Sequence, residues 1–239
     1  MKIALRKTSL LDYPGKIAAA AFVSGCNLRC PWCHNPELVR PEPESWNTET
    51  LSPDEVLAFL HKRRAVLSGA VISGGEPCLW KDLPGFIAEI KKIPLLVKLD
   101  TNGTIPSMLE MIFADEKSRP DYIALDLKLA PSRYALLING PAANTAGALK
   151  QSAALIHSSG IEHGFRTLAL PMNFITERDI EELAPLVDEA PWQFRAFRGG
   201  NCLDKTWDCI EETEAELEKR AKDLAEKARQ LGKRGIGPG

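Results

Sequence analysis

Short apolar runs and amphipathic helical stripes alternate along nearly the whole chain of 239 residues. The apolar runs are too short for helices and predict buried strands at residues 17–24, 70–73, 94–99, 122–127, 165–170 and 192–197. Between them, apolar residues recur at helical spacing, as in the stripe of Leu83, Phe86, Ile87 and Ile90. Strands that alternate with helices predict an α/β fold with a parallel sheet. Six such units, two fewer than a closed barrel has, predict a single-domain partial (β/α)6 barrel.

Helix boundaries are also marked in the sequence. Ser52, followed by a proline and by Glu55, forms a capping box that predicts the start of a helix. Thr176 is predicted to cap a later helix, and Gly232 is predicted to follow the end of the last one. The stretch 41–50 reads as a surface connection. We expect one domain over residues 1–239, with its core at about 7–231 and a flexible tail at 232–239.

Three cysteines, Cys26, Cys30 and Cys33, follow the first predicted strand with the spacing C-x3-C-x2-C. Cysteine is the soft ligand of iron–sulfur clusters, and a cluster held by three cysteines leaves one iron free to bind a substrate or cofactor. Structural zinc takes four ligands, and His34 is an awkward fourth ligand because it directly follows Cys33. The spacing favours a cluster, with zinc or simply packed thiols as the alternatives.

Polar or glycine residues follow the ends of several predicted strands, where active sites of parallel α/β folds gather. Gly74 and Gly75 would let a backbone approach a ligand closely, or form a tight exit from the strand. Asp100 ends an apolar strand, where an unpaired carboxylate is costly, although a local turn could cap it. Asp126 and Lys128 lie two apart on one strand and share a face, so they could pair with each other or bind a ligand.

Composition and charge exclude some classes of partner. The net charge of −2 and the pI near 6.1 give no electrostatic signature for nucleic acid or an anionic membrane. We find no apolar run of membrane-spanning length and no signal-peptide core, and therefore expect a cytoplasmic protein. Cysteines stay reduced there, and we expect Cys78, Cys202 and Cys209 to be buried or incidental thiols.

The cysteine motif resembles that of the radical S-adenosylmethionine (SAM) enzymes. The run Thr-Ser-Leu-Leu-Asp-Tyr-Pro-Gly-Lys at 8–16 and the run Cys-His-Asn-Pro-Glu-Leu at 33–38 resemble the activating proteins of anaerobic (class III) ribonucleoside-triphosphate reductase. Ile-Ser-Gly-Gly-Glu-Pro at 72–77, Leu-Asp-Thr-Asn-Gly at 99–103 and Ala-Leu-Asp-Leu-Lys at 124–128 follow in the order of that family. The resemblance extends from about Lys7 to about Asp204 and implies the same partial barrel.

The resemblance implies a 4Fe–4S cluster on Cys26, Cys30 and Cys33, with SAM bound to its open iron. Reductive cleavage of SAM would give a 5′-deoxyadenosyl radical that takes the α-hydrogen of a glycine in a large glycyl-radical protein, the anaerobic ribonucleotide reductase. A flavodoxin or ferredoxin would supply the electron. The implied SAM contacts are Trp32 at the adenine, His34, Gly74, Gly75, Glu76 at the ammonium, Asp100, Asn102, Asp126, Lys128 and Arg166. Gln193 and Arg195 are expected to face the protein substrate.

Three alternative interpretations remain. Another radical SAM enzyme, such as a 7-carboxy-7-deazaguanine synthase, would share the cysteine motif but not the Leu-Asp-Tyr-Pro-Gly-Lys leader. An activase of a different glycyl-radical enzyme would share both. A zinc-stabilised binding module would leave the strand-end motifs unexplained. The chain departs from the family pattern at two cysteines. The resemblance suggests threonine or another small residue in place of Cys78, and threonine in place of Cys202. Either thiol could add sensitivity to oxidation.

Overall fold

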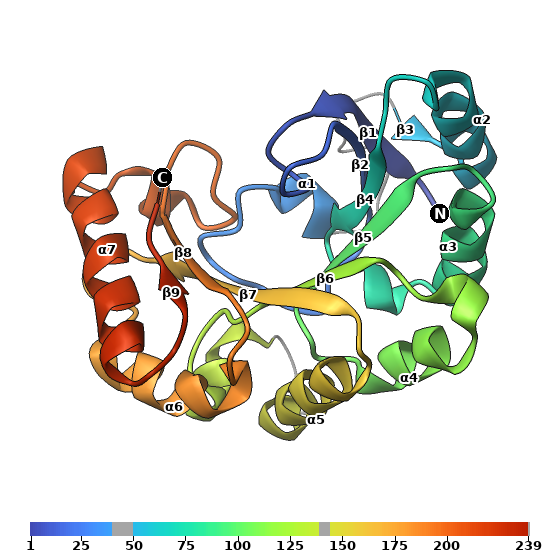
Figure 1. Ribbon diagram of the computed structural model, residues 1–239. Helices are drawn as coiled ribbons and strands as arrows, with labels where there is room; N and C mark the ends of the chain where they lie inside the picture. Colours follow the sequence, from blue (N-terminus) through green and yellow to red (C-terminus); the bar gives the residue numbers. More distant parts are fainter. Residues whose placement is uncertain (40–49, 139–143, 239) are drawn as a thin grey trace.

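A nine-stranded sheet forms the centre of the fold in the computed structural model, which describes residues 1–39, 50–138 and 144–238 (Figure 1). The strands lie in the order β3-β1-β2-β4-β5-β6-β7-β8-β9. Their bounds are β1 Ile3–Ser9, β2 Ala18–Val23, β3 Thr50–Leu51, β4 Gly69–Gly74, β5 Leu96–Thr101, β6 Tyr122–Asp126, β7 Glu162–Ala169, β8 Trp192–Ala196 and β9 Gly235–Ile236. Neighbours from β2 to β9 are parallel, whereas β1 is antiparallel to β2 and β3. The six strands predicted from the sequence thus form the open barrel.

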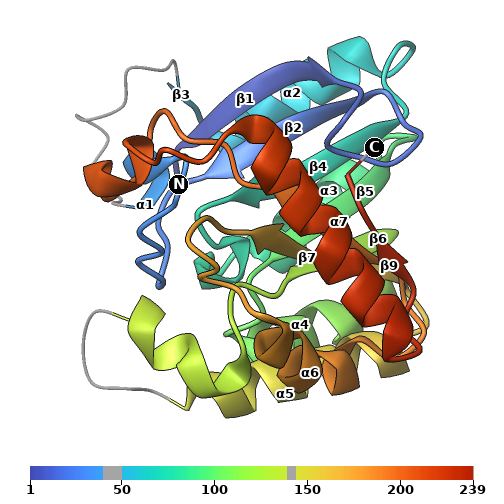
Figure 2. The same cartoon turned by 90° about the vertical axis from the view of Figure 1, so that its left-hand side faces the viewer.

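Helices cover the outer side of this curved sheet. They are α2 Pro53–Arg63, α3 Leu83–Lys91, α4 Pro106–Ala114, α5 Thr145–Ser158, α6 Glu177–Val187 and α7 Glu214–Gln230. The short α1, Pro36–Val39, instead lies beside the cysteine motif, and its Val39 lines the cavity described below. Figure 1 shows α2 to α7 along the outside of the sheet, and Figure 2 shows α7 lying across its β7 to β9 side. None of the described helices has the length and apolar character needed to cross a membrane.

The two faces of the sheet differ in chemistry because side chains alternate along each strand. In β5, Val97 and Leu99 are fully buried in the main hydrophobic core on the helix side. Lys98 and Asp100, on the other face, point into the concave side of the sheet and are also largely buried. The concave face therefore carries charged groups that need partners, and it is the face on which the predicted site residues meet.

Local helix signals in the sequence are confirmed. Ser52 and Glu55 form a reciprocal capping box at the start of α2. Thr176 and Asp179 form another at α6, and Gly232 has a positive φ of 75° just beyond α7. The buried stripe of α3 consists of the four residues that the spacing predicted. These signals involve neighbouring residues, so they do not depend on the rest of the fold.

The ends of the chain are more ordered than the sequence interpretation expected. Ile3, outside the predicted core of 7–231, is fully buried in β1. The expectation of a flexible tail after residue 231 is corrected by β9, in which Gly235 pairs with Trp192 of β8. A two-residue strand has no periodicity of its own, so its pairing depends on a distant partner. Most of the predicted connection at 41–50 lies outside the described residues.

Candidate active site

A cavity of about 320 Å³ lies at the carboxyl ends of the parallel strands. Its walls come from the ends of β4 to β8 and from the cysteine loop, defined here as residues 24–35 between β2 and α1. This volume is within the range of small-molecule sites, near its lower limit. The residues expected to bind the cluster and SAM all line it: Cys26, Cys30, Trp32, Cys33, His34, Gly74, Gly75, Glu76, Asp100, Asn102, Asp126, Lys128 and Arg166. Arg195 also lines it, whereas Gln193 does not.

Backbone hydrogen bonds fix the cysteine loop to several distant parts of the chain. Gly25 N–H donates to the carbonyl oxygen of Leu38 in α1 at 2.8 Å. Further bonds join Arg29 N to Leu137 O at 2.7 Å, Leu203 N to Cys33 O at 3.0 Å and Asp204 N to Pro31 O at 2.9 Å. The loop has little regular structure of its own, so these contacts determine its shape.

The three thiols of the loop are suited to a cluster. Cys30 is buried and Cys26 and Cys33 are partly buried, and all three line the cavity. Burial raises the pKa of Cys26 to about 11 and that of Cys30 to about 12, so binding iron would displace protons. No three of the described His, Cys, Asp and Glu side chains converge closely enough for a single metal ion. A 4Fe–4S cluster needs no such convergence, because its cysteines bind different iron atoms.

Gly74 and Gly75 have no room for a side chain, because the backbone before and within the cysteine loop passes over them. A Cβ on Gly74 would lie 2.4 Å from both the nitrogen and the carbonyl oxygen of Val23, and one on Gly75 would lie 2.1 Å from the carbonyl oxygen of Gly25. Gly75 N–H donates to Val23 O at 2.9 Å, and Glu76 N–H donates to Gly25 O at 2.8 Å. The sequence suggested glycines for the approach of a ligand, whereas in the structure they also admit the cysteine loop.

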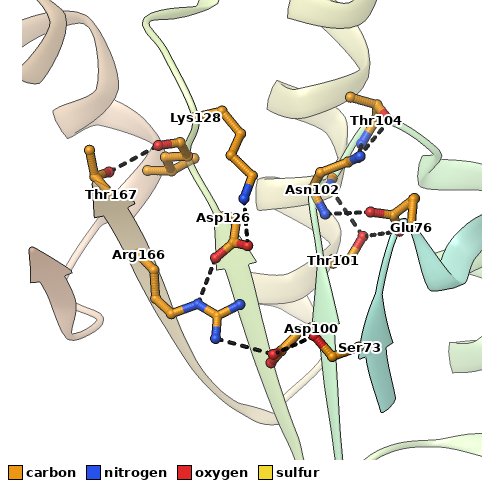
Figure 3. Close-up of polar contacts among 12 residues, drawn as sticks. Ser73, Glu76, Asp100, Thr101, Asn102, Thr104, Asp126, Lys128, Arg166 and Thr167 are labelled. Carbon is orange, nitrogen blue, oxygen red and sulfur yellow. Dashed lines mark hydrogen bonds and ion pairs between the residues drawn. The ribbon is translucent and has the colours of Figure 1, made fainter. Parts of the chain in front are cut away.

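The Glu76 carboxylate is only 1% exposed and is bonded within the protein (Figure 3). Oε1 accepts hydrogen bonds from Thr101 Oγ1 at 2.7 Å and from Cys78 N at 3.0 Å, and Oε2 accepts one from Asn102 N at 2.7 Å. Burial raises its pKa, while these donors act in the opposite direction. Glu76 therefore joins the end of β4 to the end of β5, a structural function that the sequence did not reveal.

Asn102 forms the local turn that the sequence offered as an alternative, and it also contacts the cysteine loop. Its Oδ1 accepts hydrogen bonds from Thr104 N at 3.0 Å and Thr104 Oγ1 at 2.6 Å. Its Nδ2 donates to Asn27 Oδ1 at 3.1 Å, and Asn27 Nδ2 donates to Thr104 Oγ1 at 2.7 Å. This closed ring of three side chains ties the cysteine loop to the exit of β5.

Charged side chains on the concave face form a chain of alternating sign, which we call the ion network (Figure 3). Arg166 Nε lies 2.6 Å from Asp126 Oδ1, and Arg166 Nη1 lies 3.2 Å from Asp100 Oδ2. Lys128 Nζ pairs with Asp126 Oδ2 at 2.9 Å, and Lys98 pairs with Asp100. Asp126 and Lys128 thus form the ion pair that was one of the two predicted possibilities. The network of three cations and two anions carries a formal charge of +1.

The ion network favours the charged form of Asp126. Burial alone would raise the pKa of Asp126, but Arg166 and Lys128 outweigh it and hold that pKa well below its usual value. Lys98 was not singled out from the sequence, and its side chain is only 3% exposed. Its position two residues before Asp100, on the same face of an otherwise apolar strand, was the signal that could have identified it.

Trp32 and His34 lie among aromatic rings. The Trp32 ring is 2% exposed and packs against Phe174 and Trp207, with centroids 5.5 and 5.3 Å away. It packs beside the cysteine loop and also lines the cavity, and its expected contact with adenine stays a prediction. The His34 ring stacks on Phe197 at 5.3 Å, and burial lowers its pKa.

The remaining cysteines lie outside the cavity lining. Cys78 and Cys202 are buried, as expected, and Cys209 is exposed. Cys78 Sγ lies 3.4 Å from Thr101 Oγ1. The lining also includes residues that the sequence analysis did not single out, among them Asp12, Ser73, Thr101 and Leu168. Their types are common in loops and strand ends, so only the fold identifies them.

A parallel partial barrel with three cysteines in a loop after its first parallel strand is the arrangement of one enzyme superfamily. The family model described as the radical SAM superfamily matches residues 21–187, and the chain belongs to this superfamily. The structure resembles that of Streptococcus suis SuiB bound to S-adenosylmethionine with a TM-score of 0.62 at 15% identity, covering 91% of this chain and 49% of that one. Native anSMEcpe with bound AdoMet gives 0.59 at 15% identity, covering 89% and 60%. At these identities the likeness concerns the fold.

Curated relatives include activating enzymes. A Methanocaldococcus jannaschii protein assigned by name to the glycyl-radical enzyme activating enzymes is 36% identical over 127 residues, 53% of this chain and 49% of that protein. A pyruvate formate-lyase-activating enzyme of Staphylococcus aureus is 32% identical over 123 residues, 49% of each chain. The 7-carboxy-7-deazaguanine synthase of Aquifex aeolicus is 34% identical over 83 residues, 35% of each. The chain matches about half the length of the first two relatives and less of the third.

Membership of the superfamily brings a 4Fe–4S cluster and SAM as cofactors. The residues present fit both groups. Three thiols line one cavity and supply the soft donors that iron requires. The ion network beside them supplies charged groups of both signs, which suits a ligand that carries an ammonium, a sulfonium and a carboxylate.

Proposed function

We propose that this protein is a radical SAM activase that generates a glycyl radical on anaerobic ribonucleoside-triphosphate reductase. The observation that carries the proposal is the 36% identity to a relative named as a glycyl-radical enzyme activating enzyme. The leader at 8–16 and the run at 33–38, which resemble the activases of that reductase, support this particular target. The proposed partners are the large reductase and a low-potential donor such as flavodoxin or ferredoxin, in the cytoplasm.

In the proposed site, Cys26, Cys30 and Cys33 hold the cluster. When bound and reduced, the cluster supplies the electron that cleaves SAM into methionine and a 5′-deoxyadenosyl radical. The protein's own contribution is binding and orientation.

The ion network is the proposed contact surface for SAM. Asp126 would accept hydrogen bonds from ribose hydroxyls, and Lys128 and Arg166 would donate to the methionine carboxylate. Asp100 and the backbone carbonyl groups at Gly74 and Gly75 would accept from the ammonium. We assign Glu76 and Asn102 to holding the strand ends and the cysteine loop in place, because they are only 1% and 4% exposed and their hydrogen bonds join these segments.

Two other functions have specific support. The Staphylococcus aureus relative favours an activase of another glycyl-radical enzyme, such as pyruvate formate-lyase. The Aquifex aeolicus relative favours a small-molecule reaction like that of 7-carboxy-7-deazaguanine synthase, although over a shorter match. The small-molecule reaction ranks lowest because its relative matches over only 83 residues. An activase of another glycyl-radical enzyme would share the leader, and the experiment below distinguishes it from an activase of the reductase.

The experiment is anaerobic reconstitution with iron and sulfide, followed by reduction in the presence of SAM and one candidate substrate at a time. The candidates are the anaerobic reductase, pyruvate formate-lyase and the substrate of 7-carboxy-7-deazaguanine synthases. The proposal expects 5′-deoxyadenosine and a glycyl-radical resonance only with the reductase. A reductase in which the radical glycine is replaced by alanine is the matched control. A radical formed only on pyruvate formate-lyase, or turnover of only the small molecule, would contradict the reductase as the target and identify the other substrate instead.

A further inference from the structure

Arg195 is an exposed cation at the edge of the cavity. It lies on β8, on the concave face, and lines the cavity with Arg166 and Lys128. Arg166 and Lys128 are both paired with Asp126. Arg195, in contrast, forms no ion pair with any residue in the described parts of the chain. Arg195 is thus a further cation beside the ion network, and the carboxylates of Asp126, Asp100 and Asp12 act on it without forming an ion pair.

Gln193 holds Arg195 in this position. Arg195 Nε donates to Gln193 Oε1 at 3.1 Å, and Gln193 is in register with Arg166 on β7. The guanidinium has five N–H donors in a fixed fork. One of them is used by Gln193, and the structure shows no side-chain hydrogen bond from the others to a described residue. The two terminal nitrogens remain available for an oxygen acceptor.

The position of Arg195 favours an acceptor that enters from the side. β8 is the last of the six barrel strands and is followed at the edge of the sheet only by the short β9. Arg195 is in register with Leu168 near the carboxyl end of β7, beyond the pair of Arg166 and Gln193. Partial desolvation and the nearby Arg166 lower its pKa, and the carboxylates of Asp126, Asp100 and Asp12 act in the opposite direction. A group arriving there would meet donors that no protein acceptor has taken.

The chemistry of the proposed substrate identifies the acceptor. A glycine has no side chain, so a site that selects a glycine within a protein must contact the backbone around it. Each peptide group offers a carbonyl oxygen with two lone pairs. Arginine can donate two parallel hydrogen bonds to such oxygens. Resting on the proposed function, we infer that Arg195, oriented by Gln193, binds backbone carbonyl oxygen of the substrate protein beside the glycine that receives the radical.

The test uses the reconstituted enzyme and compares Arg195→Gln with Arg198→Gln. Arg198 lies three residues further on and pairs with Glu214, and its side chain is 73% exposed. Two quantities are measured for each variant: the SAM dissociation constant by equilibrium dialysis, and KM and kcat for radical formation on the reductase. Arg195→Gln is expected to raise the KM for the reductase at least tenfold, with the SAM dissociation constant unchanged. Arg198→Gln is expected to change neither.

Each other outcome counts against the inference. Weaker SAM binding with an unchanged KM would assign Arg195 to the carboxylate of SAM. Equal KM values for Arg195→Gln and the wild type would overturn the inference while leaving the proposed function intact. If the wild-type enzyme itself forms no radical on the reductase, the proposed function fails, and the inference fails with it. Arg195→Lys keeps the charge but loses the planar fork of donors. Its KM for the reductase is therefore expected to lie between the values of the wild type and of Arg195→Gln.

Discussion

Replacing Gly75 by alanine is expected to destabilise the protein through a clash between two backbone segments. The added Cβ would lie 2.1 Å from the carbonyl oxygen of Gly25, 2.6 Å from its carbonyl carbon and 3.0 Å from the carbonyl oxygen of Leu38. None of these atoms belongs to a flexible side chain, so the cysteine loop itself would have to move. That movement would stretch the hydrogen bonds from Gly75 N–H to Val23 and from Glu76 N–H to Gly25.

The expected loss of stability combines two effects. Forcing an extra methyl group into a packed site costs about 1–3 kcal/mol. Losing one of the two hydrogen bonds costs about 1 kcal/mol more. Gly75→Ala is therefore expected to lower the free energy of unfolding by about 2–4 kcal/mol. Urea denaturation of metal-free, reduced protein measures this as a lower midpoint, and the absence of metal separates the effect from cluster loss.

Gly85→Ala is the matched control. Gly85 lies in α3, and a Cβ there would have no heavy atom within 4 Å. Because alanine favours a helix more than glycine, this variant is expected to be more stable than the wild type by up to about 1 kcal/mol. A Gly75→Ala midpoint equal to or above that of the wild type would refute the close approach of the two segments.

Three further predictions concern the cluster, SAM and the helix cap. Cys30→Ala should abolish the brown colour and all SAM cleavage, whereas the exposed Cys209→Ala should change neither. Asp126→Ala should keep the cluster but weaken SAM binding about tenfold to a hundredfold, because a charged hydrogen bond is lost. Asp179→Asn should lose about 1–3 kcal/mol of stability at neutral pH, because Asp179 accepts hydrogen bonds from Arg133 at 2.8 Å and caps α6. Burial opposes ionisation of Asp179, but these hydrogen bonds outweigh it and lower its pKa.

Iron content and product chromatography test Cys30→Ala and Cys209→Ala. Equilibrium dialysis of SAM tests Asp126→Ala, and urea midpoints across pH test Asp179→Asn. The pKa of Asp179 is lower in the folded protein, so its stabilisation is complete above about pH 4 and is lost as the pH falls through the folded pKa. The difference between wild type and Asp179→Asn should shrink below about pH 4. Cleavage retained in Cys30→Ala, unchanged SAM affinity in Asp126→Ala, or a difference for Asp179→Asn that grows in acid would each contradict the corresponding assignment.

The sequence was informative wherever the signal was local or periodic. The capping box at Ser52 and the α3 stripe required only neighbouring residues, and both were predicted correctly. The six barrel strands were identified because each is a short apolar run between turn signals. The gathering of the strand-end motifs in one cavity followed from the topology of a parallel sheet.

What the sequence could not provide were contacts between distant residues. The place of Trp32 beside Cys33 did not reveal that its ring packs against Phe174 and Trp207, which are far along the chain. Glu76 was assigned to SAM because the motif contains it, whereas three donors at the turn and on β5 occupy its carboxylate. β1 and β9 were missed because their pairing depends on partners with stronger strand patterns.

The hydrogen bonds from Leu203 and Asp204 to the cysteine loop have a consequence for biogenesis. Nearly the entire succession of strands and helices separates these two segments in the chain. During synthesis the three thiols emerge early, yet the loop that carries them cannot take its final shape until residues beyond β8 have left the ribosome. The cysteines therefore remain in an unfinished loop until Leu203 and Asp204 have been synthesised. Delivery of iron and sulfide is best matched to the time after these residues have bonded to the loop.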